Sequence, residues 1–186
     1  MNVLEAIRSR RSIKRFTAQP VTREQIETLL DAATLAPNHR LTQPWRFYVL
    51  GPAARHAYGM ALGERKARKQ PDPESGRVLR DTVAREHLEL PSMIAVAVVQ
   101  TGDPEIAKED FAAAMMAVQT LSLAALELGL GTHIKTGGVM DDSAARAAAG
   151  VAENERIVAI VNVGVPAETP PAKKRSSAAS FTNWRD

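Results

Sequence analysis

The 186-residue chain contains no cysteine. This absence excludes a disulfide-stabilised scaffold, a zinc–cysteine module, an iron–sulfur protein and a cysteine nucleophile. Aromatic residues are also few, at 4%, whereas 45% of the residues are hydrophobic. A chain of this length and composition can bury a core without disulfides or a metal. We therefore expect residues 1–186 to form a single domain.

Long apolar runs are absent as well. The run Met93–Val99, for example, is far shorter than the roughly 20 residues that a transmembrane helix needs. Arg8, Arg10 and Arg11 interrupt the start of the chain before the apolar region of a signal peptide could form. These features predict a soluble, cytoplasmic protein that has no membrane partner.

The common catalytic motifs are missing. Gly129-x-Gly131 is followed by Ile134 where a dinucleotide-binding motif needs its third glycine, and there is no Walker A, H-E-x-x-H or G-x-S-x-G sequence. The histidines show no metal-ligand spacing, so we expect no metal site. They are His39, His56, His87 and His133.

Charge is concentrated at the two ends of the chain. Residues 1–20 hold five basic side chains and one acidic one, and residues 165–186 hold four basic and two acidic. The segment between them carries 15 basic and 18 acidic residues, so the overall net charge of +3 hides two basic ends around an acidic body. This distribution predicts an anionic partner that contacts the termini.

Hydrophobic periodicity predicts helices and strands in irregular alternation. Thr22 and Gln25 have the spacing of a capping box at the start of a helix that ends before Pro37. Further helices are expected over 53–69, 77–89, 105–128 and 141–149, with a loop over 70–76. Strands are expected over 46–50, 93–99, 132–136 and 157–163. This order favours an α+β fold with a small mixed or antiparallel sheet flanked by helices.

Two polar clusters precede the first expected strand. Arg10-Arg11-Ser12 could clamp a phosphate, since arginine binds it bidentately and a serine hydroxyl adds a hydrogen bond; it could equally be a solvated helix end. The segment from Ala36 to Trp45 contains Asn38, His39 and Gln43, whose donors and acceptors suit the edge of a heterocycle. It could also be an ordinary connecting loop.

Two further clusters lie near the end of the chain. Gly131–Gly138 combines glycines, which allow close approach of the backbone to a ligand, with the cation of Lys135. The tail after Pro166 contains Lys173-Lys174-Arg175 and still carries Phe181 and Trp184. Two of the chain's few aromatic residues in a terminal segment indicate that this segment docks on its own chain or on a partner chain.

Taken in order, these clusters resemble the FMN-dependent nitroreductase family, and its small YdjA-like branch in particular. Arg10-Arg11-Ser12…Phe16 is similar to the family's opening R-R-S-x-R-x-[FY] motif, and Ala36-Pro37…Gln43-Pro44-Trp45 to its A-P…Q-P-W motif. Val163-Gly164-Val165-Pro166 and the basic run behind it are similar to the family's ending. The resemblance covers nearly the whole chain.

The resemblance implies a nitroreductase-like fold and an intertwined homodimer with two FMN sites at its interface. The basic extension 165–186 would embrace the partner subunit. The implied FMN-binding residues are Arg10, Arg11, Ser12, Leu35, His39, Gln43, Ile134, Lys135, Thr136, Lys174 and Arg175. Of these, Leu35 and His39 would approach from the other subunit. Ile134 and Lys135 replace the branch's tryptophan and arginine, so a stacking contact and a bidentate fork are lost.

The activity implied by the family is ping-pong oxidoreduction, in which NADH or NADPH reduces FMN and an electron-poor acceptor such as a nitroaromatic or quinone reoxidises it. No catalytic side chain is expected, because the flavin carries the chemistry. Lys135 is the candidate cation for stabilising the reduced flavin. Residues 55–90 would shape the substrate pocket.

Other functions fit the same residues. A different flavin chemistry, such as oxidation or dehalogenation, would use the same fold, and a flavin-binding or regulatory protein would need no turnover. A nucleic-acid-binding domain using both basic ends is the weakest alternative, because aromatic residues do not interleave with the basic ones and the body is acidic. We expect no nucleic-acid partner.

Overall fold

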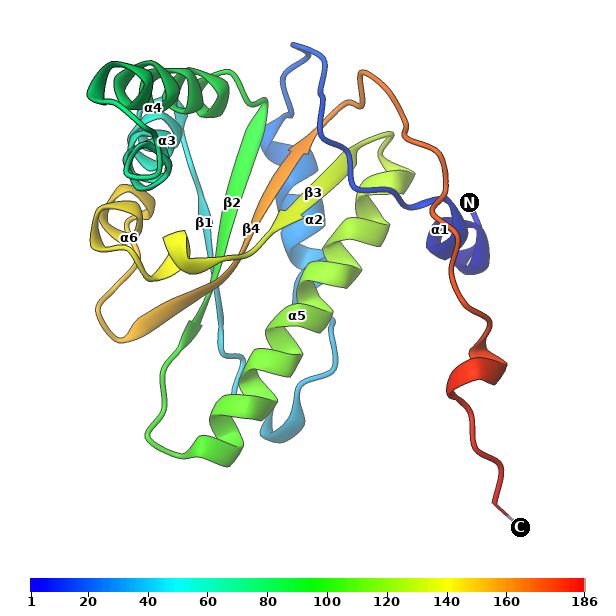
Figure 1. Ribbon diagram of the computed structural model, residues 1–186. Coiled ribbons are helices and arrows are strands. Elements are labelled where there is room, and N and C mark those ends of the chain that lie inside the picture. The colour runs from blue at the N-terminus through cyan, green and yellow to red at the C-terminus, as the bar shows by residue number, and fades with distance from the viewer. Residues whose placement is uncertain (186) are drawn as a thin grey trace.

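The computed structural model describes residues 1–185, and Figure 1 shows the arrangement of its elements. The elements in chain order are α1 (Val3–Ser9), α2 (Arg23–Thr34), the 3-10 turn η1 (His39–Leu41), β1 (Trp45–Val49), α3 (Pro52–Ala67), α4 (Pro73–Leu88), β2 (Ser92–Val99), α5 (Pro104–Glu127), β3 (Gly131–Lys135), η2 (Gly138–Asp141), α6 (Ser143–Ala149), β4 (Glu155–Gly164) and η3 (Ala178–Phe181).

The four strands form one sheet in the order β1-β2-β4-β3, and every neighbouring pair is antiparallel. The expected α+β class is therefore confirmed, and of the two sheet types expected, the antiparallel one is found. A single parallel bridge, between Ser12 and Thr132, lies outside the named strands. The first four residues of β2 pair with residues 160–163 of β4, and the register shifts between Val96 and Ala97.

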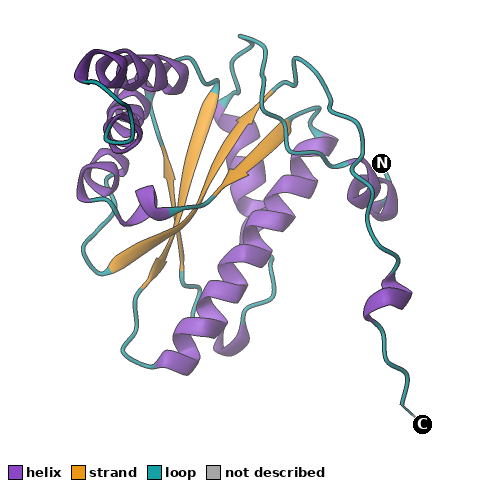
Figure 2. Ribbon diagram, in the orientation of Figure 1, coloured by secondary structure: helices purple, strands orange, loops and turns teal. Residues whose placement is uncertain are grey.

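Helices cover both faces of the sheet, which explains why β2 and β4 are buried along nearly their whole length (Figure 2). One buried cluster joins the sheet to α2 and α5 and includes Leu29, Val96 and Leu121. A second cluster on the other face joins the sheet to α3 and α6 and includes Tyr58 and Met93. Alternate residues of each central strand thus contribute to different cores.

The segment between α1 and α2 runs along the outer edge of β3. The amide of Ile13 donates to the carbonyl of Thr132 at 2.9 Å, and the amide of Thr17 donates to Val165 at 2.9 Å. The amide of Ala167 donates back to Arg15 at 3.0 Å. The N-terminal segment is therefore held between β3 and the start of the tail.

The capping box predicted for α2 is confirmed: Gln25 N donates to Thr22 Oγ1, and Thr22 N donates to Gln25 Oε1. The prediction of a loop over 70–76 was wrong for residues 73–76, because α4 begins at Pro73. Asp72 caps this helix by accepting a hydrogen bond from Ser75 N at 2.9 Å. Proline is favourable at the first helical position, where no amide donor is needed.

The tail beyond Pro171 is exposed along its described length and runs past α1, away from the body of the molecule (Figure 1). Phe181 is 78% exposed and Trp184 is 91% exposed. Of the two docking places expected for these aromatic residues, the chain itself is not used in this structure. Among residues 1–185, no helix is long and apolar enough to cross a membrane.

Helices α3 and α4 pack closely at glycines. A Cβ on Gly63 would lie 2.7 Å from the carbonyl oxygen and 2.8 Å from the Cα of Arg80. We expect Gly63→Ala to lower the free energy of unfolding, because the overpacking cost of about 1–3 kcal/mol exceeds the gain of about 1 kcal/mol in helix propensity. Urea denaturation measures the difference.

The matched control is Gly102→Ala, because a Cβ on Gly102 meets no atom within 4 Å. Its free energy of unfolding should change by no more than about 0.5 kcal/mol. If Gly63→Ala is as stable as this control, the close α3–α4 packing is contradicted.

Candidate functional site

Arg10, Arg11 and Ser12 lie where α1 ends and the N-terminal segment meets β3. Arg11 caps α1, since its Nη1 donates to the carbonyls of Arg8 at 2.7 Å and Arg10 at 2.9 Å. Its Nε is buried and has no partner among residues 1–185. The side chains of Arg10 and Ser12 make no hydrogen bond or ion pair within the described chain, so both remain available for a ligand.

Ile134, Lys135 and Thr136 lie at the end of β3, on the same edge of the sheet. The Thr132 carbonyl faces outward to accept from Ile13, so strand alternation also turns the amide and carbonyl of Ile134 outward. Beyond Thr132 this edge has no strand partner in the described chain. Free donors and acceptors at a sheet edge are suited to the polar rim of a planar ligand.

The Lys135 side chain does not share the edge. Ile134 packs against the α2–α5 core, so Lys135 projects from the opposite face, toward α3 and α4. Burial lowers the pKa of Lys135, and the positive charge of Lys66 on α3 lowers it further, against an opposing effect of Glu86.

The start of the tail lies near the same place. Glu168 forms a bidentate ion pair with Arg15, which fixes the start of the tail beside the N-terminal segment. Thr169 and Pro166 line a small cavity together with Arg10 and Arg11. Lys174 and Arg175 follow, exposed and free of ion pairs within residues 1–185.

The second polar cluster of the sequence, around residues 38–43, forms a strained loop beside the first turns of α5. Arg40, Leu41 and Gln43 have positive φ angles of 63°, 51° and 45°. Such backbone costs about 1–3 kcal/mol per residue and persists only where surrounding contacts impose it. Here Asn38 Oδ1 accepts from the Gln43 amide at 2.6 Å. Strain of this kind is concentrated at functional sites, which makes the loop a candidate.

Three acidic residues of α5 hold this loop. Buried Asp110 accepts a hydrogen bond from Thr42 Oγ1. Glu109 contacts His39 Nδ1 at 2.9 Å, and Arg40 contacts Glu109 and Glu105 at 3.2 Å each. The hydrogen bond with His39 is the main cause that lowers the pKa of Glu109. The side chains of Leu35, His39 and Gln43 are exposed.

The sequence does not predict these supporting residues. Nothing in the spacing of Arg40, Thr42 and the acidic residues indicates that a loop and the first turns of a distant helix are in contact, since they are more than 60 residues apart. Positive φ at non-glycine residues likewise leaves no signal in the sequence.

Within one chain the structure separates the predicted site residues into two groups. The loop contacts Glu105 and Glu109, whereas the amino group of Met1 at the start of α1 contacts Glu127 Oε2 at 3.2 Å, at the far end of α5. A helix rises 1.5 Å per residue, so about 30 Å lie between the two ends. The segment Arg10-Arg11-Ser12 meets the start of β3 and the start of the tail. The loop that carries Leu35, His39 and Gln43 lies at the opposite end of α5.

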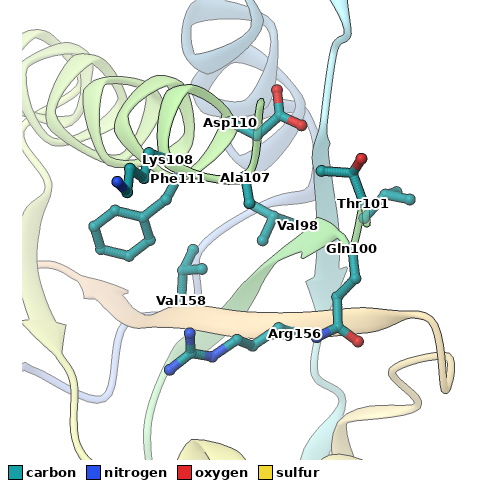
Figure 3. Close-up of a pocket in the computed structure, with 10 residues that line it drawn as sticks. Val98, Gln100, Thr101, Ala107, Lys108, Asp110, Phe111, Arg156 and Val158 are labelled. Atoms are coloured by element: carbon teal, nitrogen blue, oxygen red, sulfur yellow. The ribbon is translucent and has the colours of Figure 1, made fainter. Parts of the chain in front are cut away.

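A pocket of about 360 Å³ lies beside the loop, between the first turns of α5, the end of β2 and the start of β4 (Figure 3). Val98, Val158 and the half-exposed ring of Phe111 form its apolar surface, and Lys108 and Arg156 supply positive charge. This mixture suits a small aromatic molecule with an electron-rich polar substituent. Among the described residues, no group of three or more acidic or histidine side chains is placed to hold a metal ion.

A family model described as "Nitroreductase family" matches residues 7–165. The chain belongs to the nitroreductase family. The candidate NAD(P)H nitroreductase YfhC of Bacillus subtilis is 34% identical to it over 175 residues, which are 92% of this chain and 88% of YfhC. The candidate NAD(P)H nitroreductase YdjA of Escherichia coli is 27% identical over 167 residues, or 89% of each chain.

Solved structures confirm the nitroreductase-like fold. A nitroreductase-like family protein from Bacillus cereus has a TM-score of 0.86 at 26% identity, covering 100% of this chain and 97% of its own. A candidate nitroreductase from Desulfovibrio desulfuricans, crystallised with FMN, has a TM-score of 0.74 at 26% identity and covers 100% and 98%.

The residues of this nitroreductase-family protein fit FMN. The free cation of Arg10, the buried unpartnered Nε of Arg11 and the exposed hydroxyl of Ser12 form a donor set suited to a phosphate. The unpaired edge at Ile134 lies beside them and offers a backbone donor and acceptor to a flavin ring.

The strained loop generates a prediction about stability. Thr42 Oγ1 donates to Asp110 and accepts from Asn38 Nδ2 at 3.0 Å. We expect Thr42→Val to lower the free energy of unfolding by about 1–3 kcal/mol, since it leaves a buried carboxylate without its donor. Thermal and urea unfolding measure the change.

The control is Thr28→Val, which removes an exposed hydroxyl that bonds only to Glu24 O within its own helix. It should change the free energy of unfolding by no more than about 0.5 kcal/mol. Equal effects of the two substitutions would show that the loop does not depend on Asp110.

Proposed function

We propose that this nitroreductase-family protein is an FMN-dependent oxidoreductase that takes hydride from NADH or NADPH and reduces nitroaromatics, quinones or similar electron-poor acceptors by a ping-pong mechanism. The observation that carries the proposal is the convergence of the unpaired cation of Arg10, the free edge of β3 and the start of the tail on one place. The similarity to YfhC and YdjA, whose names describe NAD(P)H nitroreductases, supports it.

The proposed role of the N-terminal segment is to bind the phosphate. Arg10 and Ser12 would supply direct contacts, and Arg11 would add its buried Nε while its Nη1 continues to cap α1. Lys174 or Arg175 would add positive charge from the tail. Arginine at such a site gives a geometry that lysine cannot replace.

The proposed role of the β3 end is to orient the ring. The outward backbone groups of Ile134 and the amide of Thr136 would bind its polar edge, and Lys135 would act through its charge from the opposite face of the strand. FMN, when bound, supplies hydride and electron transfer between the nicotinamide and the acceptor. No side chain is required as a proton donor in an open site.

We further propose that two chains complete each site. The loop carrying Leu35, His39 and Gln43 lies about 30 Å from Arg10 within one chain, so it would reach the flavin of a partner subunit. Exposed apolar side chains support such a homodimer, because α1 buries no residue and Phe111 and Met116 of α5 are at least 40% exposed. The tail with Phe181 and Trp184 would dock on the partner.

The activity is tested on the purified protein. We expect bound or reconstituted FMN whose absorbance bleaches anaerobically with NADH or NADPH and recovers when a nitroaromatic is added. A protein that cannot be reconstituted with FMN contradicts the proposal. Bound flavin that neither nucleotide reduces would identify a flavin-binding protein without turnover.

The shared site is tested by complementation. Arg10→Ala and His39→Ala should each weaken FMN retention, the first by about 1.5–3 kcal/mol for a lost charged hydrogen bond. When the two variants are co-refolded, random pairing gives mixed dimers with one intact site each, so about a quarter of the sites should recover.

The control for this experiment is Arg8→Ala, a neighbouring change on α1 that should retain FMN. No recovery on mixing, together with a monomeric sedimentation coefficient for the flavin-bound protein, would exclude a site shared between subunits.

A further inference from the structure

A second basic cavity, distinct from the Arg10 region, lies between α3, α4 and the loop after β3. Its volume is about 400 Å³. Arg65, Lys66 and Lys69 of the α3 end line it, and no acidic side chain does. Its remaining lining residues are Leu62, Gln70, Leu79, Thr136, Gly137, Gly138 and Val139.

The cations of this cavity are not neutralised by the protein. Among residues 1–185, none of Arg65, Lys66 and Lys69 forms an ion pair, although Glu74 and Asp81 on nearby α4 pair with arginines elsewhere. Lys66 also repels Lys135, whose pKa it lowers. Unpaired positive charges around one cavity favour the binding of an anion, because the anion reduces the repulsion between the cations.

The loop wall of the cavity adds backbone donors. Gly137 has a φ of 135°, and the amides of Gly137 and Gly138 donate to no acceptor in the described chain. The Arg65 guanidinium lies over Gly138, where a Cβ would come within 2.6 Å of its Nη2. Exposed glycine amides beside a guanidinium are a common setting for phosphate oxygens.

The position of the cavity separates it from the FMN phosphate site. Ser12 bridges Thr132, whereas the cavity begins at Thr136, about 13 Å further along the strand direction at 3.3 Å per residue. It therefore starts where the segment proposed to orient the flavin ring ends. A dinucleotide whose nicotinamide lies on that ring could extend its phosphates into the cavity.

We propose that this cavity binds the phosphate groups of the reduced nicotinamide dinucleotide, with Arg65, Lys66 and Lys69 as the residues that determine affinity for the donor. The inference rests on the proposed function. The phosphoryl group has two possible sources, the diphosphate common to NADH and NADPH and the 2′-phosphate of NADPH. Three cations with two backbone amides match a phosphoryl group better than a single carboxylate, which offers only two oxygens.

The test compares binding of two fragments that lack nicotinamide: ADP-ribose and 2′-phospho-ADP-ribose. Each is titrated by calorimetry into the FMN-reconstituted protein, the Arg65→Gln/Lys69→Gln variant and a matched Arg68→Gln control. Arg68 caps α3 next to Lys69 but lines a different pocket, beside Glu64 and Asp72. Fragment binding does not depend on hydride transfer, so it is informative even if turnover is absent.

We expect the double substitution to weaken fragment binding about tenfold or more, as for the loss of charge-assisted hydrogen bonds, while Arg68→Gln changes it less than twofold. In stopped-flow reduction the apparent Kd for the donor should rise by the same factor, with the limiting rate and FMN content unchanged. An equal loss for both fragments assigns the cavity to the diphosphate, and a loss confined to 2′-phospho-ADP-ribose assigns it to the 2′-phosphate.

Three results would overturn the proposal. The first is fragment affinity that the double substitution leaves unchanged, and the second is no fragment binding to the parent protein. The third is a changed KM for an anionic acceptor such as nitrobenzoate with unchanged fragment affinity, since the cavity would then serve the acceptor. Failure of the proposed function is recognised separately, as fragment binding without flavin reduction.

Discussion

The candidate site depends on the contact between the N-terminal segment and the outer edge of β3. Ile13 is 3% exposed, and its amide donates to the carbonyl of Thr132, which places Arg10 and Ser12 beside the start of the strand. The approach is possible because position 131 is glycine: a Cβ there would lie 2.4 Å from Ile13 Cγ1. A single hydrogen-bonded contact thus brings residues that are 120 positions apart in the sequence to one place. The tail uses the same contact, since Val165 and Ala167 bond to the segment from its other side.

Much of the fold could be predicted from the sequence, because its signals are local. The capping box at Thr22, the apolar run of β2 and the helical spacing in α5 each identify an element without reference to the rest of the chain. The sequence predicts the start of α4 four residues too late, because Pro73 is typical of a loop, although it stands directly after the helix cap, Asp72. The family resemblance, carried by motifs at Arg10, Pro37 and Gly164, is confirmed by the match over 7–165.

The site could be predicted only in part, because its geometry depends on long-range contacts. The sequence predicts the residues at Arg10 and Ile134. The outward direction of the Ile134 backbone groups and the projection of the Lys135 side chain toward α3 and α4 follow from the register of β3 with β4. The contact of Thr42 with Asp110 and the positive φ angles of the loop leave no trace in the spacing of the residues. The basic cavity beside Gly137 was also missed, since its cations belong to α3 and its glycines follow β3.

The length of α5 has a consequence for how the protein would respond to its own concentration. If one half of each site lies at either end of this helix, as we propose, an isolated chain carries two incomplete halves and no whole site. Flavin uptake and subunit association are then linked equilibria: saturating FMN shifts the chains toward pairs, and dilution below the dissociation constant of the pair releases flavin. Specific activity would fall with dilution and return on adding free FMN, which makes cofactor supply a control on assembly.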